Sequence, residues 1–301
     1  MKTQFASSDL LPVCVMAGLF VLVDLLAFSV AGPFYDAGGG AFPDPGNPLN
    51  IVFFIVTMLV VTAFILLIIK FWKKEILKYF FLGSTIFLSF YVFYLLLVGV
   101  ADPLVSLALA VVGAGLLLFA ILKKPEWYVI DAVALFMAVG TIALIGISLT
   151  VPLVIILLIA MAVYDAIAVY RTKHMIDMAD SFIDMKLPVV FVVPRKKGYS
   201  LIKQEKSLKD QIKDGDERGA YFLGVGDVVF PGILAVSAFH SLPDNGLLMA
   251  LSVLVGSLIG FFVLMTLVIK GKPQAGLPLL CSGAILGYLV AGFLVFGFPP
   301  F

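Results

Sequence analysis

Long apolar stretches alternate with short polar breaks along most of this chain. Each stretch has about 20 residues, the length that an α-helix needs to cross the hydrocarbon core of a bilayer. The breaks are rich in glycine, proline and lysine, as in GGGAFPDPGNP at 38–48 and KKPEW at 123–127. The pattern predicts nine transmembrane helices, over residues 11–32, 50–70, 79–100, 103–122, 127–148, 150–170, 219–240, 247–269 and 276–297.

The composition indicates the same class of protein. Hydrophobic residues make up 62% of the chain and charged residues 13%, which is about half of the charged share in soluble proteins. Nineteen of the charged residues lie between Arg171 and Arg218. The rest of the chain has too few charges to cover a surface in water, so we predict an all-α, multi-pass integral membrane protein.

The basic residues all fall on one side of the predicted topology. They precede the first apolar stretch or follow the second, fourth, sixth and eighth. The charged residues of the opposite loops are all acidic, namely Asp36, Asp44, Asp102 and Asp244. Because basic loops stay in the cytoplasm, the N-terminus is expected to be cytoplasmic and the C-terminus extracytoplasmic. A net charge of +1 gives no electrostatic basis for binding nucleic acid.

The predicted loop between the sixth and seventh helices, residues 171–218, separates helices one to six (1–170) from helices seven to nine (219–301). Hydrophobic residues between Met175 and Met185 recur at helical spacing, which predicts a short amphipathic helix on the membrane surface. The run Pro188–Pro194 is rich in valine and favours a short strand. Residues 195–218 are highly charged and are expected to be solvated.

Four aspartates fall within predicted membrane helices, where an ionisable group is costly and often functional. Asp131 lies one turn inside the fifth helix beside Trp127 and Tyr128, so placement at the membrane interface explains it. Asp24 lies deeper in the first helix, and we favour a structural role for it over the lining of a wet cavity.

Asp165 and Asp227 differ from the other two because their predicted depths agree. Asp165 precedes Arg171 by six residues, and Asp227 follows Arg218 by nine, so both lie in the cytoplasmic half of the membrane. Two carboxyl groups close together in a low dielectric do not both ionise, so the pair holds one acid and one base. Such a pair can activate water against an amide. A proton relay or an ion site would use the same residues.

Two short motifs accompany these aspartates. Gly224 and Gly226 lie within one turn before Asp227, and glycine admits a close backbone approach. Pro278 begins the run Pro278-Leu279-Leu280 at about the same depth, and a proline there frees backbone groups that must face protein or water.

Val163-Tyr164-Asp165, Gly224-Val225-Gly226-Asp227 and Pro278-Leu279-Leu280 together resemble the presenilin and signal peptide peptidase family of intramembrane aspartyl proteases. The resemblance implies that Asp165 and Asp227 are the catalytic pair and that Tyr164, Gly224 and Gly226 shape the site. It also implies that Pro278, Leu279 and Leu280 support substrate, with Leu279 in place of the family's alanine. The distribution of basic residues corresponds to the presenilin orientation rather than that of signal peptide peptidases.

The resemblance implies an endopeptidase that cleaves transmembrane helices in the lipid bilayer and uses no cofactor. No metal site is expected, because His174 and His240 fall on opposite faces of the membrane. An ion-coupled transporter or channel, and a prepilin-type peptidase, remain alternatives. The sequence leaves open the physiological substrate and assembly into a homo-oligomer.

Overall fold

A computed structural model of the chain describes residues 7–71, 74–172, 185–195, 198–202, 219–242, 244–269 and 274–300. Most of these residues lie in helices, and the remaining elements are a π-helix and two short strands. In chain order the elements are α1 (Ser7–Asp36), α2 (Leu49–Phe71), α3 (Lys74–Val98), α4 (Pro103–Lys123), α5 (Trp127–Gly146), α6 (Val151–Ile167), η1 (Ala168–Thr172), β1 (Val190–Pro194), β2 (Ala220–Gly224), α9 (Val225–Ser241), α10 (Gly246–Ile269) and α11 (Leu277–Phe296).

Eight helices of the described part are long and apolar enough to cross a membrane. They correspond to eight of the nine predicted helices, which confirms an integral, multi-pass membrane protein. Residues 147–150 separate α5 from α6, and Pro152 lies in the first turn of α6, where its missing N–H is tolerated. α3 begins at Lys74 rather than at 79.

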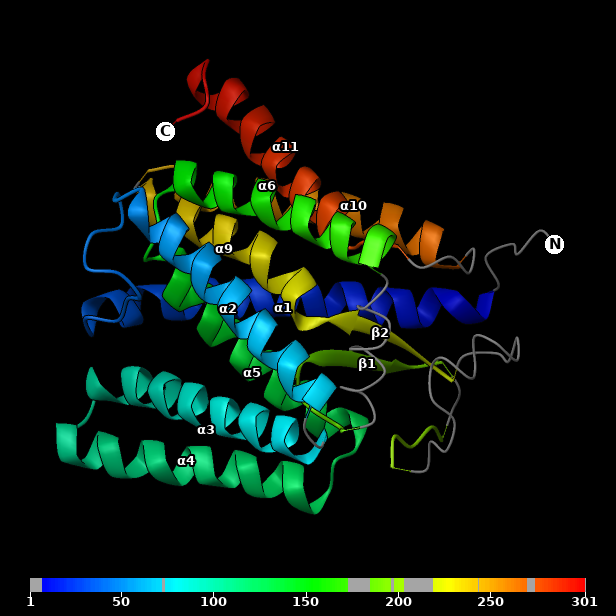
Figure 1. The fold of residues 1–301 in the computed structure, drawn as a ribbon. Coiled ribbons are helices and arrows are strands. Elements are labelled where there is room, and N and C mark those ends of the chain that lie inside the picture. The colour runs from blue at the N-terminus through cyan, green and yellow to red at the C-terminus, as the bar shows by residue number, and fades with distance from the viewer. Residues whose placement is uncertain are drawn as a thin grey trace.

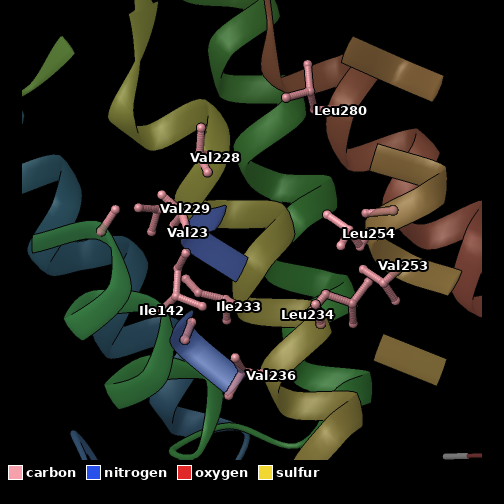
Figure 2. Close-up of a cluster of buried hydrophobic side chains, with 14 of the residues drawn as sticks. Val23, Ile142, Val228, Val229, Ile233, Leu234, Val236, Val253, Leu254 and Leu280 are labelled. Carbon is pink, nitrogen blue, oxygen red and sulfur yellow. The ribbon is translucent and has the colours of Figure 1, made fainter. Parts of the chain in front are cut away.

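The helix α9 lies at the centre of the bundle and contacts α1, α5, α6, α10 and α11. Its apolar residues from Val228 to Ala238 are buried almost without interruption. Figure 2 shows Ile233 and Leu234 of α9 in one cluster with Val23 of α1, Ile142 of α5 and neighbouring side chains of α10 and α11. The element that begins beside Asp227 is therefore held on all sides by packed helices.

Two helix pairs flank this core (Figure 1). α3 and α4 form a hairpin at one side of the bundle, and α10 and α11 form the other pair. The second pair is tight because Gly256 of α10 meets the backbone of Gly283 of α11, leaving no room for a Cβ atom at either residue. Small residues allow such close approach between membrane helices.

β1 and β2 form a two-stranded antiparallel sheet in which Val190 pairs with Gly224 and Pro194 with Ala220. β1 lies within the run 188–194 that favoured a strand, and it begins at Val190. The helix predicted over 219–240 is wrong in its first residues, because 220–224 form β2 and the helix begins only at Val225. The segment Ala-Tyr-Phe-Leu-Gly is as apolar as the beginning of a membrane helix, so its composition does not distinguish a strand from a helix. Its pairing with β1 makes it a strand. The amphipathic helix predicted over 175–185 lies almost entirely outside the described residues.

Candidate active site

Asp165 and Asp227 lie at the ends of two helices that meet near one another. Asp165 belongs to the last turn of α6, directly before the π-helix η1, and its side chain is 2% exposed. Asp227 belongs to the first turn of α9, three residues after the end of β2. π-helical turns are frequent at functional sites, and here one follows the aspartate by three residues.

Both carboxylates reach the N-terminal turn of α11. Oδ2 of Asp165 accepts a hydrogen bond from the backbone N–H of Leu277 at 3.1 Å, and Asp165 also hydrogen-bonds the backbone of Gly276. The carboxylate of Asp227 packs against Gly276 so closely that a Cβ atom there would lie 2.8 and 2.9 Å from its two oxygens. Because Gly276 and Leu277 are consecutive, the two aspartates face a common point and interact electrostatically.

The backbone around this point suits negative charge. The first N–H groups of a helix have no partner within the helix, and the dipole of α11 places partial positive charge at its first turn. Asp227 also hydrogen-bonds the backbone of Gly224. Oδ1 of Asp165 is buried and has no hydrogen-bond partner within the described residues. The site can thus stabilise one ionised carboxylate and present a second carboxyl oxygen to a reacting group.

Gly276 belongs to the candidate site, and the sequence analysis did not single it out, although it began the ninth helix at 276. Gly276 is the N-cap residue of α11, and its φ of −78° and ψ of −50° are ordinary helical values. Glycine is therefore needed for the close approach of Asp227 and not for an unusual backbone. The sequence could have indicated Gly276 through its position two residues before Pro278. A proline there marks the first turn of a helix, and the backbone N–H groups of that turn have no partner within the helix.

The residues Pro278, Leu279 and Leu280 form the first turn of α11 together with Leu277. Pro278 occupies the N1 or N2 position, where its missing N–H is tolerated. Leu280 is fully buried, and Leu279 is half-buried with its carbonyl against Gly260 of α10. The motif thus holds the start of α11, with its two backbone donors, at the aspartates.

Tyr164 and Gly226 lie beside the aspartates but contact them less directly. Tyr164 is half-buried and packs against the main apolar core. A Cβ atom at Gly226 would meet only the ring of Phe230, at 3.9 Å. In contrast, a Cβ atom at Gly224 would lie 3.3 Å from Oδ2 of Asp227, so Gly224 is the glycine of this motif that approaches the carboxylate.

The other two membrane aspartates are apart from this point. Asp131 is 8% exposed, so its side chain is buried within the protein. Its Oδ1 accepts a hydrogen bond from the Val192 N–H of β1 at 2.7 Å. Asp24 is 1% exposed and lies against α9, where a Cβ atom at Gly232 would be 2.5 Å from its Oδ1.

A hydrogen bond at the surface joins the segment that follows α6 to the segment that precedes α11. The hydroxyl of Tyr170 in η1 donates to Oε1 of Gln274 at 3.0 Å. Tyr170 follows Asp165 by five residues, and Gln274 precedes Gly276 by two. This contact lies at the surface and ties the end of α6 to the approach to α11.

Within the described ranges, His, Cys, Asp and Glu side chains do not gather in groups of three or more that could hold a metal ion. His240 is exposed and its ring lies 4.4 Å from that of Tyr35. His174 lies outside the described residues. The chemistry available at the aspartates is therefore that of two carboxyl groups and backbone N–H donors.

Comparisons with known proteins agree with this geometry. A family model described as "Signal-peptide peptidase, presenilin aspartyl protease" matches residues 17–298. Two solved structures of a presenilin family intramembrane aspartate protease, in space groups C222 and P2, each match with a TM-score of 0.67. The first structure shares 29% sequence identity with this chain, and the second shares 31%. Each match covers 95% of this chain, and it covers 100% of the first structure's chain and 99% of the second's. A comparison with curated proteins gives no match. The chain therefore belongs to the signal-peptide peptidase, presenilin aspartyl protease family, and it is an intramembrane aspartic endopeptidase.

Proposed function

We propose that Asp165 and Asp227 are the catalytic pair of this protease. The observation that carries the proposal is the convergence of both carboxylates on Gly276 and Leu277. The family match favours this chemistry over the transporter, the channel and the prepilin-type peptidase that the sequence left open.

The reaction requires one ionised and one protonated carboxyl group. The ionised aspartate takes a proton from water as the water oxygen bonds to the carbonyl carbon of the scissile amide. The protonated aspartate gives its proton to the carbonyl oxygen, which yields a neutral tetrahedral intermediate. The aspartate that took a proton from water then gives it to the amide nitrogen as the carbon–nitrogen bond breaks. The other aspartate, now ionised, takes a proton from a hydroxyl group of the intermediate, which becomes the new carboxyl group, so the pair again holds one proton. The positive end of α11 stabilises the negative charge on the pair throughout.

The substrate class is a transmembrane helix of another membrane protein. A helix hides its amides in hydrogen bonds, so the segment to be cut must first unwind and become extended. An extended peptide can add to the edge of a sheet and satisfy its backbone there. The two-stranded sheet supplies such an edge one residue before α9.

The outer edge of β2 suits the substrate better than the outer edge of β1. Arg195 N donates to Gly219 O at 2.9 Å and Val225 N donates to Val189 O at 3.0 Å, so alternate residues of β1 point their backbone groups away from β2. On that side the N–H of Val192 already donates to the carboxylate of Asp131, and Pro194 has no N–H to donate. The outer edge of β1 therefore has fewer donors to offer a substrate strand. β2 has no strand on its other side within the described residues, and it leads directly to Asp227.

The finer topology follows the expectation of nine membrane spans. The helix α9 has 17 residues, about 26 Å of helix, against a hydrocarbon core of about 30 Å. The strand β2 directly precedes α9 and adds to its length. We therefore assign the ninth crossing to β2 and α9 together, with the first residues of the crossing extended rather than helical. With residues 1–170 holding six spans, 171–218 a cytoplasmic loop and 219–301 three spans, the N-terminus is cytoplasmic and the C-terminus extracytoplasmic. In support, α1 begins near the sheet and α11 ends at the far side of the molecule (Figure 1).

In this assignment Pro278, Leu279 and Leu280 support the site by holding the start of α11, and Tyr164, Gly224 and Gly226 shape its surroundings. Leu279 contributes a half-buried side chain beside the turn that carries the backbone donors. The mechanism needs a single copy of the chain, and assembly into a homo-oligomer would leave it unchanged.

The decisive experiment measures cleavage of a single-span peptide by the purified protein. Asp165→Asn and Asp227→Asn should each abolish cleavage, because the amide can neither accept nor deliver the proton. Asp36→Asn is the matched control, since Asp36 is an exposed aspartate at the end of α1. Cleavage by either dyad variant above a no-enzyme blank, with Asp36→Asn at wild-type rate, would show that the pair is not catalytic.

A further inference from the structure

A cavity that Asp165 and Asp227 do not line lies between α1, α5 and β1. Its volume is about 560 Å³. One wall comes from Leu11, Val15 and Leu19 of α1, and the other from Ala132 and Leu135 of α5. Leu11 is 73% exposed, so the cavity opens to the outer surface of the bundle.

The cavity is elongated along the two helices. From Leu11 to Leu19, and from Trp127 to Leu135, each helix advances eight residues, or about 12 Å. Every side chain that lines the deeper part is apolar apart from Asp131, and Oδ1 of Asp131 is engaged by the N–H of Val192. A hydrocarbon chain lying parallel to the helices fits such a groove.

The other end of the cavity is lined by hydrogen-bond donors. Trp127 and Tyr128 stand at the start of α5, and Arg195 and Tyr199 follow β1. Burial and the negative charge of Glu126 raise the pKa of Tyr199 to about 12, so its hydroxyl keeps its proton and can donate. Trp and Tyr are the residues that settle at the level of lipid headgroups.

Positive charge gathers at the same end. Arg195 lines the cavity. Nζ of Lys124 lies 5.6 Å from the ring centre of Tyr128, and a hydrogen bond with Tyr128 raises the pKa of Lys124. An apolar groove that ends in donors and cations is complementary to a molecule with a hydrocarbon chain and an anionic head.

We propose that this cavity binds an anionic glycerophospholipid of the cytoplasmic leaflet. One acyl chain lies between α1 and α5, and the phosphate is bound by Arg195 together with the donors at the mouth of the cavity. The cytoplasmic leaflet is the source because basic segments near the membrane attract its acidic lipids.

The cavity is joined to the candidate active site through the sheet. Val193 and Pro194 of β1 line it, and β1 pairs with β2 along its length. β2 ends at Gly224, whose backbone hydrogen-bonds Asp227. A bound lipid therefore packs against the side of β1 that lines the cavity. Through the pairing of the two strands it restrains β2, which positions Asp227. This part of the inference rests on the proposed function.

Binding can be measured with tryptophan fluorescence, because the chain has only Trp72 and Trp127. A Trp72→Phe protein reports on Trp127 alone, and brominated lipids quench it. In nanodiscs of phosphatidylcholine, brominated phosphatidylglycerol should quench Trp127 at about fivefold lower mole fraction than brominated phosphatidylcholine. Arg195→Gln should remove the preference by loss of charge, and Ala132→Phe should remove it by filling the groove.

Two control variants make this measurement specific. Lys123→Gln removes a neighbouring cation that lies over Phe119 and does not line the cavity, and Ala108→Phe adds the same bulk at an exposed position of α4. Both controls should keep the preference. Equal quenching by the two lipids, or a preference that survives Arg195→Gln and Ala132→Phe, would overturn the lipid site.

Peptide cleavage in the same nanodiscs tests the link to the sheet. Phosphatidylglycerol should raise the cleavage rate of the wild type, and Arg195→Gln and Ala132→Phe should lose that rise while keeping the rate seen in phosphatidylcholine alone. Selective binding with no change in rate would overturn the link to the active site. A failure of the catalytic pair is a separate result, because it removes cleavage in every lipid and leaves the quenching unchanged.

Discussion

Oδ2 of Asp165 accepts the backbone N–H of Leu277 at 3.1 Å, although 112 residues separate the two in the chain. The bond joins the end of α6 to the beginning of α11, and Asp227 from α9 meets the same turn at Gly276. Three helices thus share one small region of backbone. The first turn of α11 aligns the two aspartates, and changes in this turn should affect catalysis without removing either carboxyl group.

Gly276→Ala should lower kcat/KM by about 10²-fold, because a displacement of reacting groups by about 1 Å has an effect of this size. The new Cβ would lie 2.8 Å from Oδ1 of Asp227, and the helical φ and ψ of Gly276 permit alanine without backbone strain. Steady-state kinetics with a single-span peptide measure the effect. Gly115→Ala in α4 is the control, since nothing lies within 4 Å of its added Cβ, and equal losses in the two variants would contradict the prediction.

Asp131→Leu should destabilise the protein by about 1–3 kcal/mol, because it leaves the buried N–H of Val192 without an acceptor. Asp131→Asn keeps a side-chain oxygen and should have a smaller effect. Thermal unfolding in detergent compares the two variants. If Asp131→Asn were as unstable as Asp131→Leu, the charge of Asp131 and not its hydrogen bond to β1 would be responsible.

The cleavage rate should show a bell-shaped dependence on pH. At low pH both aspartates are protonated, so no base remains to activate water, and the rate falls as pH decreases. At high pH both are ionised, so no acid remains, and the rate falls as pH increases. The two limbs belong to the pair and not to one residue. Initial rates across the pH range test this, with circular dichroism at each pH to show that the fold is retained. A rate that climbs steadily into alkaline solution would rule out a shared proton.

Cysteine labelling should place Lys123 on one side of the membrane and Asp44 and Asp244 on the other. The two native cysteines are first replaced, Cys14→Ser at the exposed position and Cys281→Ala at the buried one. A membrane-impermeant maleimide applied to sealed vesicles of known orientation then reports each site. Labelling of the Lys123 and Asp244 substitutions from the same face would overturn the nine-span topology.

Most of the fold could be predicted from the sequence, because a membrane helix must satisfy its backbone internally and so must be long and apolar. The pair of aspartates was also visible, since charges within spans are rare and these two had matching depths. β2 could not be predicted in the same way. Residues 220–224 are as apolar as the helix that follows, and their extended form depends on a partner about 30 residues earlier in the chain.

The contacts of the aspartates could not be predicted for a related reason. Gly276 and Leu277 act through backbone atoms, and backbone donors carry no residue-specific signal. Asp131 appeared interfacial because it lies one turn inside α5, yet the strand β1 covers it and uses its carboxylate. In each case the sequence identified the polar group, and only the packing of distant segments identified its partner.

The open side of β2 also has a consequence for solvation. Strand edges cannot face hydrocarbon, because each bare peptide group there is penalised by several kcal/mol. The outward backbone groups of β2 must therefore meet protein or water rather than lipid chains. A peptide that adds along this edge takes over those hydrogen bonds, so it can join the strand without leaving its own backbone groups unpaired. The loss of helical hydrogen bonds in an unwound substrate is thereby compensated within a few residues of Asp227.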